Sequence, residues 1–446
     1  MDANWSNLSP GEKLEARFAE WMMPQGMQFA NAEAEQAYQE RTQMIKDVVQ
    51  LKKPKRVPVC PIIGFYPFQY AGVTGQEAMY NTEKLGYALR KFHADFQPDS
   101  LSGAAIYGSG PIFETLDYQL YRWPGHGVPS TTPYQCVEAE YMKGDEYDLF
   151  INDPSGYFAR FYLPRVFKAL DAWKMTAPLT DILELPFFGP YIVPIGIPPV
   201  QEAYLKLLEA GRMAMEWIQA CGAIDAVTIS TLGIPVLMGG FTKAPFDTLG
   251  DTLRGTRAIM LDMYRQPKKL LAAMERLVPL AIDMAVRTAS LGHNPMVFIP
   301  LHKGADGFMS DKDFKTFYWP TLKAVILGLV QEGLVPYIFV EGGYNQRLDV
   351  ITDPDIPQGT TIWIFDQTDM KEVKKRFTGW ACFGGNVPVS LLKAATPGVV
   401  SDYVKELIDT VGQDGGYILA TGAVLDDAQA ENLHAMIRTG KEYGKY

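Results

Sequence analysis

Cysteine is scarce in this chain, and its spacing excludes two kinds of small domain. Only 4 of the 446 residues are cysteine, and no two of them form a C-x-x-C pair. A disulfide framework or a zinc ribbon would need more cysteines at closer spacing. Positive charge is also in deficit, with 41 Lys and Arg against 51 Asp and Glu, a formal net charge of −10. Because nucleic acids bind basic surfaces, we expect no nucleic-acid partner.

The chain also lacks a hydrophobic run that could cross a bilayer. The longest candidate, FFGPYIVPIGIPPV at 187–200, is too short and is interrupted by four prolines. The first residues, MDANWSNLSPGEKLEARF, show no basic and apolar signal-peptide pattern. We therefore expect a cytoplasmic protein that does not enter a membrane.

What the chain does contain is a regular alternation of short apolar runs and amphipathic helices between 296 and 385. The runs MVFIPLH, YIFVE and TIWIFD end at His302, Glu341 and Asp366, and the next run, WACFGG, contains Cys382. Runs of four to seven residues that are rich in β-branched and aromatic side chains predict buried strands. The C-terminal ends of consecutive parallel strands converge, and in an α/β barrel they hold the chemistry. These residues are therefore the strongest functional signal in the sequence.

The order of the remaining elements predicts an α/β fold, a (β/α)8 TIM barrel at 56–446 that follows an N-terminal helical extension at 1–55. Further strands are predicted at 57–66, at 100–108, at 223–231 and in GGYILATG near the end. A doubly wound open sheet is the alternative, although no glycine-rich dinucleotide turn follows the first strand. The aromatic segment 112–154 is too long for a plain connection. It is predicted to be an inserted lid or a subunit contact, the second of which would imply a homodimer.

The C-terminal third carries a family resemblance. The stretch FGGNVPVSLLKAATPGVVSDYVKELIDTVGQDGGYILATG, followed by ENLHAMIRTGKEYG, resembles the uroporphyrinogen decarboxylase superfamily. That superfamily includes corrinoid (cobamide)-dependent methyltransferases and is built on a (β/α)8 barrel, so the resemblance implies the same fold here.

Two positions depart from the superfamily pattern. The decarboxylases carry an Arg-rich motif after the first strand, whereas this chain reads IIGFYPFQYAG. A substrate with many carboxylates needs several cations around it, which makes that decarboxylation improbable here. The zinc methyltransferases use a His-x-Cys that aligns with Phe339-Val340-Glu341, and a later Cys that aligns with Ala423.

Substitute metal ligands are available in the same half of the barrel. Zinc accepts nitrogen, oxygen and sulfur, and a catalytic site uses three protein ligands and one open position. We predict that His302, Glu341 and Cys382 bind zinc, and that Asp366 orients His302 or is itself a ligand. The resemblance then implies methyl transfer from a small methyl donor, foremost a methoxylated aromatic, to the corrinoid of a separate protein.

Aromatic side chains near two strand ends are candidates for substrate binding. Tyr66, Phe68 and Tyr70 follow the first strand, and Phe241 follows a later one. They would wall a pocket for a planar substrate, or else pack against the N-terminal helices. Two alternatives to the methyltransferase remain. One is a metal-independent decarboxylase or lyase acting on another substrate, and the other is a barrel that binds corrinoid without turnover.

Overall fold

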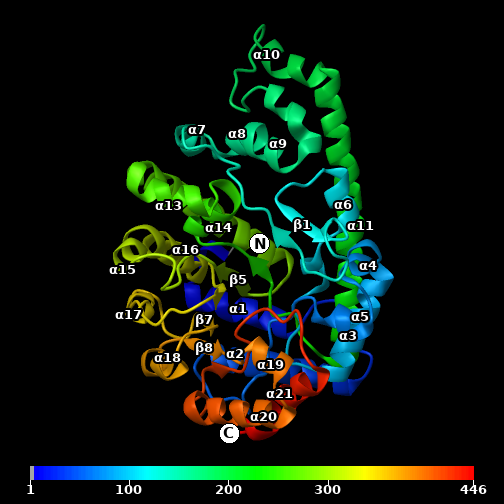
Figure 1. The fold of residues 1–446 in the computed structure, drawn as a ribbon, viewed down its shortest axis with the longest axis vertical. Coiled ribbons are helices and arrows are strands. Elements are labelled where there is room, and N and C mark those ends of the chain that lie inside the picture. Colours follow the sequence, from blue (N-terminus) through cyan, green and yellow to red (C-terminus); the bar gives the residue numbers. More distant parts are fainter. Residues whose placement is uncertain (1–4) are drawn as a thin grey trace.

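The computed structural model describes residues 5–446 and contains a barrel of parallel strands surrounded by helices (Figure 1). Six strands form one sheet in the order β4-β5-β6-β7-β8-β9. Their bounds are β4 (Gly240–Phe241), β5 (Met296–Leu301), β6 (Val335–Val340), β7 (Ile362–Phe365), β8 (Cys382–Gly385) and β9 (Tyr417–Ile418). The four strands predicted between 296 and 385 are therefore confirmed.

Two shorter segments, 57–63 and 99–101, close this sheet into a ring. Val59 pairs in parallel with Leu419, next to β9, and Leu101 pairs in parallel with Val236, just before β4. The N–H of Asp99 donates to the carbonyl of Val59 at 2.9 Å and joins the two segments. Parallel segments thus surround a single axis, which confirms the (β/α)8 barrel and excludes the open doubly wound sheet.

Side chains alternate between the two faces of each strand. On β5, Val297 and Ile299 pack in the large cluster shared with the surrounding helices, whereas Met296 packs with Tyr337 in the cluster inside the barrel. Because the period is two residues, the interior positions of β5 lead to His302 just beyond the strand end. The fold therefore directs this side chain toward the barrel axis.

The helices between the strands form the outer layer. The second half contains α12 (Pro245–Asp247), η6 (Thr248–Leu253), α13 (Thr256–Arg265), α14 (Pro267–Leu291), α15 (Asp311–Asp313), η7 (Phe314–Tyr318), α16 (Trp319–Gln331), α17 (Leu348–Ile351), α18 (Met370–Phe377), α19 (Val389–Ala394), α20 (Pro397–Leu407), η8 (Ile408–Gly412) and α21 (Ala430–Tyr443). Ser310 caps the start of α15, since its hydroxyl accepts the N–H of Asp313 at 3.1 Å.

The N-terminal extension closes the end of the barrel opposite to the strand C-termini. It consists of η1 (Trp5–Asn7), α1 (Pro10–Met22) and α2 (Ala32–Val49). Ser9 and Glu12 form a complete capping box at the start of α1. Phe18 and Trp21 of α1 pack in the same cluster as Cys382 and Ile418 from the barrel interior. The extension and the barrel therefore share one hydrophobic core.

The first half of the chain differs from the prediction at two strands. Only the start of the predicted strand 100–108 joins the barrel, because Ala104–Tyr107 forms the 3-10 helix η2. Residues 223–231 lie inside α11 (Pro198–Leu232), a helix of 35 residues that ends at Gly233 with a φ of 61°. The apolar run AIDAVTIST has no period that separates strand from helix, and no turn cluster divides it from the helical residues before it. The strand prediction is wrong for this reason, and the barrel strand is formed by the following residues, which lead into β4.

The other helices of the first half are short. They are α3 (Tyr66–Ala71), α4 (Gly75–Tyr80), α5 (Thr82–Phe96), η2 (Ala104–Tyr107) and α6 (Gly110–Thr115). The insertion adds β1 (Tyr121–Pro124), β2 (Gly127–Val128), β3 (Gln135–Cys136), α7 (Tyr147–Asn152), α8 (Pro154–Tyr157), η3 (Phe158–Tyr162), α9 (Leu163–Val166), η4 (Lys168–Met175), α10 (Gly189–Ile192) and η5 (Val193–Gly196). The segment 112–154 is thus an ordered part of the structure with a small sheet of its own, in the order β2-β1-β3.

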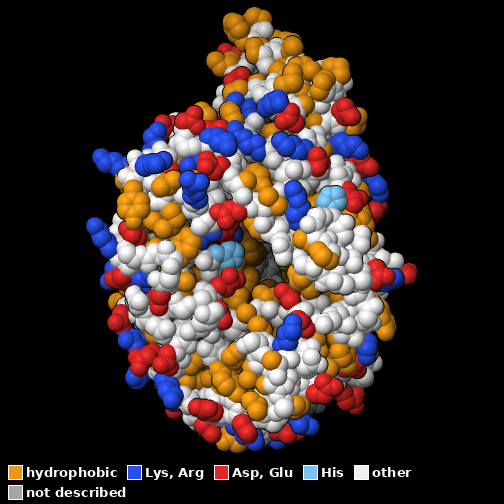
Figure 2. All heavy atoms as spheres, viewed as in Figure 1, with side chains coloured by type: hydrophobic (Ala, Val, Ile, Leu, Met, Phe, Trp, Pro, Cys, Tyr) orange, Lys and Arg blue, Asp and Glu red, His pale blue; other side chains and the backbone are white. Residues whose placement is uncertain are grey.

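One part of the chain projects beyond the barrel. α10 and the start of α11 form the tip at the top of Figure 1, and the tip carries many apolar side chains in Figure 2. Leu185 is 85% exposed there and Phe187 is 62% exposed. None of the helices between residues 5 and 446 combines the length and the apolar character that crossing a membrane requires.

Candidate active site

His302, Glu341 and Asp366 lie at the same edge of the barrel, as the strand pattern predicts. Each directly follows the last residue of its strand, β5, β6 or β7. The register pairs the last residues of β5 and β6 with each other, and likewise those of β6 and β7, so the three strands end at one level. Nε2 of His302 is 3.7 Å from Oε1 of Glu341. The structure therefore places an imidazole beside a carboxylate at the barrel mouth.

Asp251, from η6, fixes the other side of the His302 ring. Its Oδ2 is 2.5 Å from Nδ1 of His302, the distance of a strong hydrogen bond. Its Oδ1 is 2.6 Å from Nζ of Lys303, and Lys243 also forms an ion pair with it. Nε2, the other ring nitrogen, faces Glu341, and in the neutral imidazole with its proton on Nδ1 the lone pair of Nε2 is available to a metal ion. The predicted role of Asp366 as the partner that orients His302 thus belongs to Asp251.

Asp247 holds the backbone at the exit of β5. Its two carboxylate oxygens accept the backbone N–H groups of His302 and Lys303, each at 3.0 Å. The hydroxyl of Tyr318 donates to the same carboxylate at 2.6 Å. Asp247 is fully buried, so these three donors satisfy a carboxylate that would otherwise be costly to bury. The position of His302 is therefore set by its backbone as well as by its ring.

Asp366 has a different set of contacts. Its Oδ2 accepts the backbone N–H of Gly342 at 3.0 Å. The backbone of Gly422 approaches it from β9, so closely that a Cβ there would lie 3.1 Å from Oδ1. Asp366 therefore braces the loop that follows Glu341.

The charges of this cluster shift the proton affinities in opposite directions. Burial tends to lower the pKa of His302, but the hydrogen bond and charge of Asp251, with the charge of Glu341, outweigh it and raise that pKa. Burial raises the pKa of Glu341, and His302 offsets part of the rise. For Asp251, burial is outweighed by His302 and the two lysines, which hold its pKa well below the ordinary range. Asp251 is thus a permanent anion that orients the imidazole.

The structure does not bring Cys382 to this cluster. Cys382 is the first residue of β8 and pairs with Ile362, which in turn pairs with Tyr337. Tyr337 lies four positions before Glu341, or about 13 Å deeper at the rise of a strand. Cys382 is fully buried in the apolar cluster inside the barrel, and burial raises the pKa of its thiol far above the ordinary value. Its role is that of a small core side chain.

The remaining predicted ligands fit a metal only in part. Within residues 5–446, no group of three or more His, Cys, Asp or Glu side chains is arranged to hold a metal ion. Two ligands do fit: the 3.7 Å between Nε2 of His302 and Oε1 of Glu341 is close to the roughly 3.3 Å that separates two ligands of one tetrahedral zinc ion. The contact of Asp251 with Nδ1 is the carboxylate–histidine arrangement that orients zinc ligands.

A cavity of about 730 Å³ lies in the first half of the barrel, and its lining includes Phe298 of β5 but none of His302, Glu341 and Asp366. Phe298, on its wall, stacks on Phe339, which lies two positions before Glu341 on the same face of β6. In Figure 2 this side of the molecule is hollowed near its middle, with apolar side chains inside and acidic side chains at the edge. The cavity size suits a small organic ligand, since such sites measure about 300–1,000 Å³.

Of the four aromatic residues predicted to bind substrate, only Phe241 lines the cavity. Tyr66 packs against Phe92 and Phe96 of α5. Phe68 is buried against Tyr107 with a ring distance of 4.6 Å, and the hydroxyl of Tyr70 donates to Asp95 at 2.8 Å. These three residues begin α3 rather than a rim loop, so their side chains turn toward α5 and η2. The aromatic residue of this segment that reaches the cavity is Phe65.

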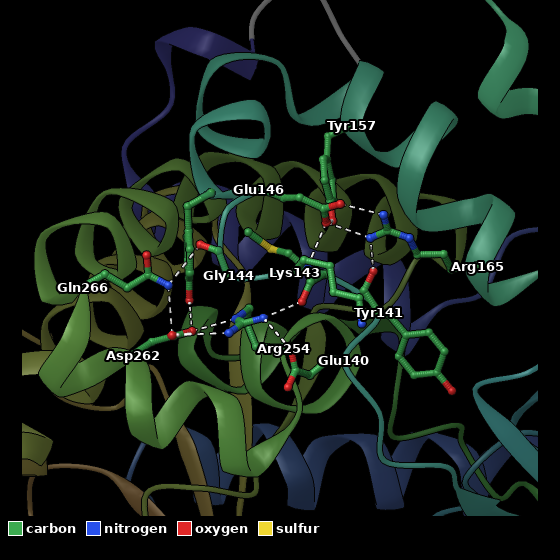
Figure 3. A network of polar contacts seen from close by, with 12 residues as sticks. Glu140, Tyr141, Lys143, Gly144, Glu146, Tyr157, Arg165, Arg254, Asp262 and Gln266 are labelled. Atoms are coloured by element: carbon green, nitrogen blue, oxygen red, sulfur yellow. Dashed lines mark hydrogen bonds and ion pairs between the residues drawn. The ribbon is translucent and has the colours of Figure 1, made fainter.

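The wall of the cavity that comes from the insertion is firmly anchored. Two ion-pair groups lie beyond Pro133 and Tyr134, which line the cavity. The first joins the segment after β3 to the barrel, and the second lies within the inserted helices (Figure 3). Arg254 donates to Asp262 at 2.6 Å and to the carbonyl of Met142 at 2.5 Å. Arg165 and the hydroxyl of Tyr157 donate to Glu146. Arg254 therefore ties the backbone at Met142 to the barrel.

Comparison with known proteins agrees with this architecture. Residues 199–443, more than half of the chain, match the family described as uroporphyrinogen decarboxylase (URO-D). The chain belongs to this family. In fold it resembles a methyltransferase from Methanosarcina mazei, with a TM-score of 0.59 and 14% identity over 91% of this chain and 98% of that chain.

A second solved structure, a B12-independent methionine synthase from Shewanella, has a TM-score of 0.33 and 13% identity over 46% of this chain and 60% of that chain. A similarity this low adds nothing to the account of the site. No protein with a curated description matches the sequence.

This member of the URO-D family has functional residues that the strand pattern did not reveal. Asp247 and Asp251 stand four residues apart after β4, a helical spacing that puts both on one face. That spacing in PFDTLGD was a usable signal. Asp426 follows β9 in the loop VLDDA, a strand-end position of the predicted kind. Asp225 lies on α11, in a segment that was predicted as a strand. No feature of the sequence therefore indicated that its side chain lines the cavity.

Proposed function

We propose that this protein is a methyltransferase that moves a methyl group from a small donor to the corrinoid of a separate protein. The observation that carries the proposal is the His302–Glu341 pair, oriented by Asp251, at the strand ends of a barrel that also contains an aromatic cavity. Membership in the URO-D family and the fold shared with a protein named as a methyltransferase support it.

We further propose that His302 Nε2 and Glu341 Oε1 hold a zinc ion, with Asp366 as the nearest candidate for a third ligand. When bound, zinc would act as a Lewis acid on the heteroatom that carries the methyl group and make it a better leaving group. Asp251 keeps the Nδ1 proton of His302 in place, so that Nε2 stays available as a ligand. Asp247 fixes the backbone of His302 and thereby the aim of the ring.

For a methyl ether donor, the bond between oxygen and the methyl carbon breaks and its electron pair remains on oxygen. The cobalt(I) of the corrinoid supplies the pair for the new bond to carbon. The oxygen then takes a proton from water. The five aromatic residues of the cavity suit a methoxylated aromatic ring, and this donor class stays a prediction.

The decarboxylase alternative has less support from the site. Removing carboxylate groups from a substrate that carries several of them needs cations to bind those groups. No Lys, Arg or His from the described residues lines the cavity. Lys243 and Lys303 are both paired with Asp251.

The proposal is tested by mixing the purified chain with a cobalt(I) corrinoid protein and donors that carry O-, S- or N-methyl groups. Cobalt methylation is followed by its absorbance change. We expect methylation with one donor class and none without the chain. The absence of methylation with every class would contradict the proposed function.

A further inference from the structure

The charged residues of the cavity are all of one sign. Among the residues that line it, Asp225 and Asp426 are the only ones with a formal charge. The remaining lining is apolar, aromatic or neutral polar. An acidic ligand in this space would approach two carboxylates with no cation to hold it.

Neither carboxylate has a cationic partner among residues 5–446, and each accepts backbone N–H donors only. Asp225 accepts the N–H of Ala104 at 3.0 and 3.1 Å through its two oxygens. Asp426 accepts the N–H of Phe65 at 2.8 Å. Burial raises the pKa of Asp225 to about 6 and also raises that of Asp426, with the backbone bonds offsetting only part of the rise. Both carboxylates are half-buried, and their partial loss of hydration is costly unless something cationic meets them.

Aromatic rings complete the surroundings of the two carboxylates. Phe65 meets Tyr107 and Tyr134 edge to face, at ring distances of 5.5 and 5.3 Å, so the three rings stand at steep angles to one another. Burial raises the pKa of the Tyr107 phenol, and the charges of both Asp225 and Asp426 add to the rise, which places Tyr107 within reach of both. Aromatic faces attract organic cations by cation–π interaction.

We propose that this cavity binds a small organic cation, and that the methyl donor of this enzyme carries a protonated amine at the end remote from its methoxy group. The amine lies between Asp225 and Asp426, and the aromatic ring of the donor packs among Phe65, Phe241 and Phe298. The role of the cation as donor rests on the proposed function, whereas the binding of the cation does not. The proposed methyl donor is thus a cationic methoxylated aromatic rather than an uncharged or acidic one.

The test uses three ligands that share the 4-methoxyphenyl group and differ in charge. They are 4-methoxyphenethylamine, the neutral 2-(4-methoxyphenyl)ethanol and the anionic 4-methoxyphenylacetate. Their affinities for the full chain are measured by titration calorimetry without corrinoid. We expect the amine to bind at least about tenfold more tightly than the alcohol, and the acid to bind more weakly still. An alcohol or acid that binds as tightly as the amine would overturn the proposal.

The variants Asp225→Asn and Asp426→Asn keep an oxygen that can accept the backbone N–H but remove the charge. Each should weaken amine binding about tenfold or more and leave alcohol binding within about twofold. Asp402→Asn, which removes the same charge from a residue that is 81% exposed, is the matched control and should change neither. Equal amine affinity in all three variants would also overturn the proposal.

Methyl transfer is then measured with the same three compounds, so that the two proposals fail separately. Amine binding in the expected order without any cobalt methylation would contradict the transferase function and support the cation site. Methylation from the alcohol or the acid, with no preference for the amine in binding, would support the transferase and overturn the cation site.

Discussion

The carboxylates on the two sides of the barrel mouth have different partners. At the ends of β5 and β6, Asp251 has His302, Lys243 and Lys303 around it, and Asp247 accepts three hydrogen bonds. Across the mouth, carboxylates lie among aromatic rings with only backbone N–H donors.

The difference separates groups that are already satisfied from groups that await a partner. Where Asp251 has the charges of His302, Lys243 and Lys303 around it, the cluster holds one imidazole in one orientation. Where a buried carboxylate has none, the protein is less stable than it would be with a neutral residue, and a ligand is the natural partner. In the proposed function, the first side would supply the chemistry and the second side would select the donor.

The largest expected effect concerns the anchor behind the cavity wall. Arg254→Met leaves Asp262 buried without its cation, since both side chains are only 5% exposed. We expect the free energy of unfolding to fall by about 3–5 kcal/mol. Arg212→Met removes a pair that is about two-thirds exposed and should cost less than about 1 kcal/mol. Denaturant unfolding measures both, and equal small losses would show that the insertion is not held by this pair.

The second effect has a pH dependence that follows from the cavity carboxylate. Burial raises the pKa of Asp225 to about 6, so the folded protein binds this proton more tightly than the unfolded chain does. Asp225 therefore lowers the free energy of unfolding increasingly as the pH rises above the ordinary pKa of an aspartate. Asp225→Asn should therefore stabilise the protein by up to about 3 kcal/mol near pH 8, and by less as pH is lowered toward about 5.

Unfolding curves at both pH values measure this gain. The exposed control Asp402→Asn should show no such dependence. A destabilised Asp225→Asn at the higher pH would mean that the carboxylate already has a partner in the folded chain, and the contrast between the two sides would fail.

These contrasts could be foreseen only in part from the sequence. Period and length identified β5 to β8, because each is a short buried strand between amphipathic helices, and the residues after three of them do meet. The depth of each side chain along the barrel axis could not be foreseen. Cys382 begins its strand whereas Glu341 follows one, so two residues in the same half of the barrel lie at different levels. Asp225 was hidden because a β-branched stretch of α11 has the composition of a strand.

A third effect concerns the orientation of His302. Asp251→Asn removes the anion at Nδ1 and leaves Lys243 and Lys303 without their shared partner. We expect metal affinity, measured by competition with a chelator, to fall about 10- to 100-fold. Asp283→Asn, at an exposed pair with Arg287, should leave it unchanged. Equal affinities in the two variants would remove Asp251 from the account of the site.

The smallest effect is expected at Cys382. Cys382→Ala removes one buried sulfur from the barrel interior and should cost about 1 kcal/mol of stability. Zinc content, measured by elemental analysis of the purified protein, should not change. A loss of zinc in this variant would return Cys382 to the set of ligands.

The most direct test of the central claim compares zinc content and cobalt methylation in Glu341→Gln and Cys382→Ala. Glutamine keeps the size of Glu341 and removes the charge that faces His302. The account predicts that Glu341→Gln loses its zinc and at least about 99% of its methylation rate, whereas Cys382→Ala keeps both. Full zinc content and full rate in Glu341→Gln would contradict it.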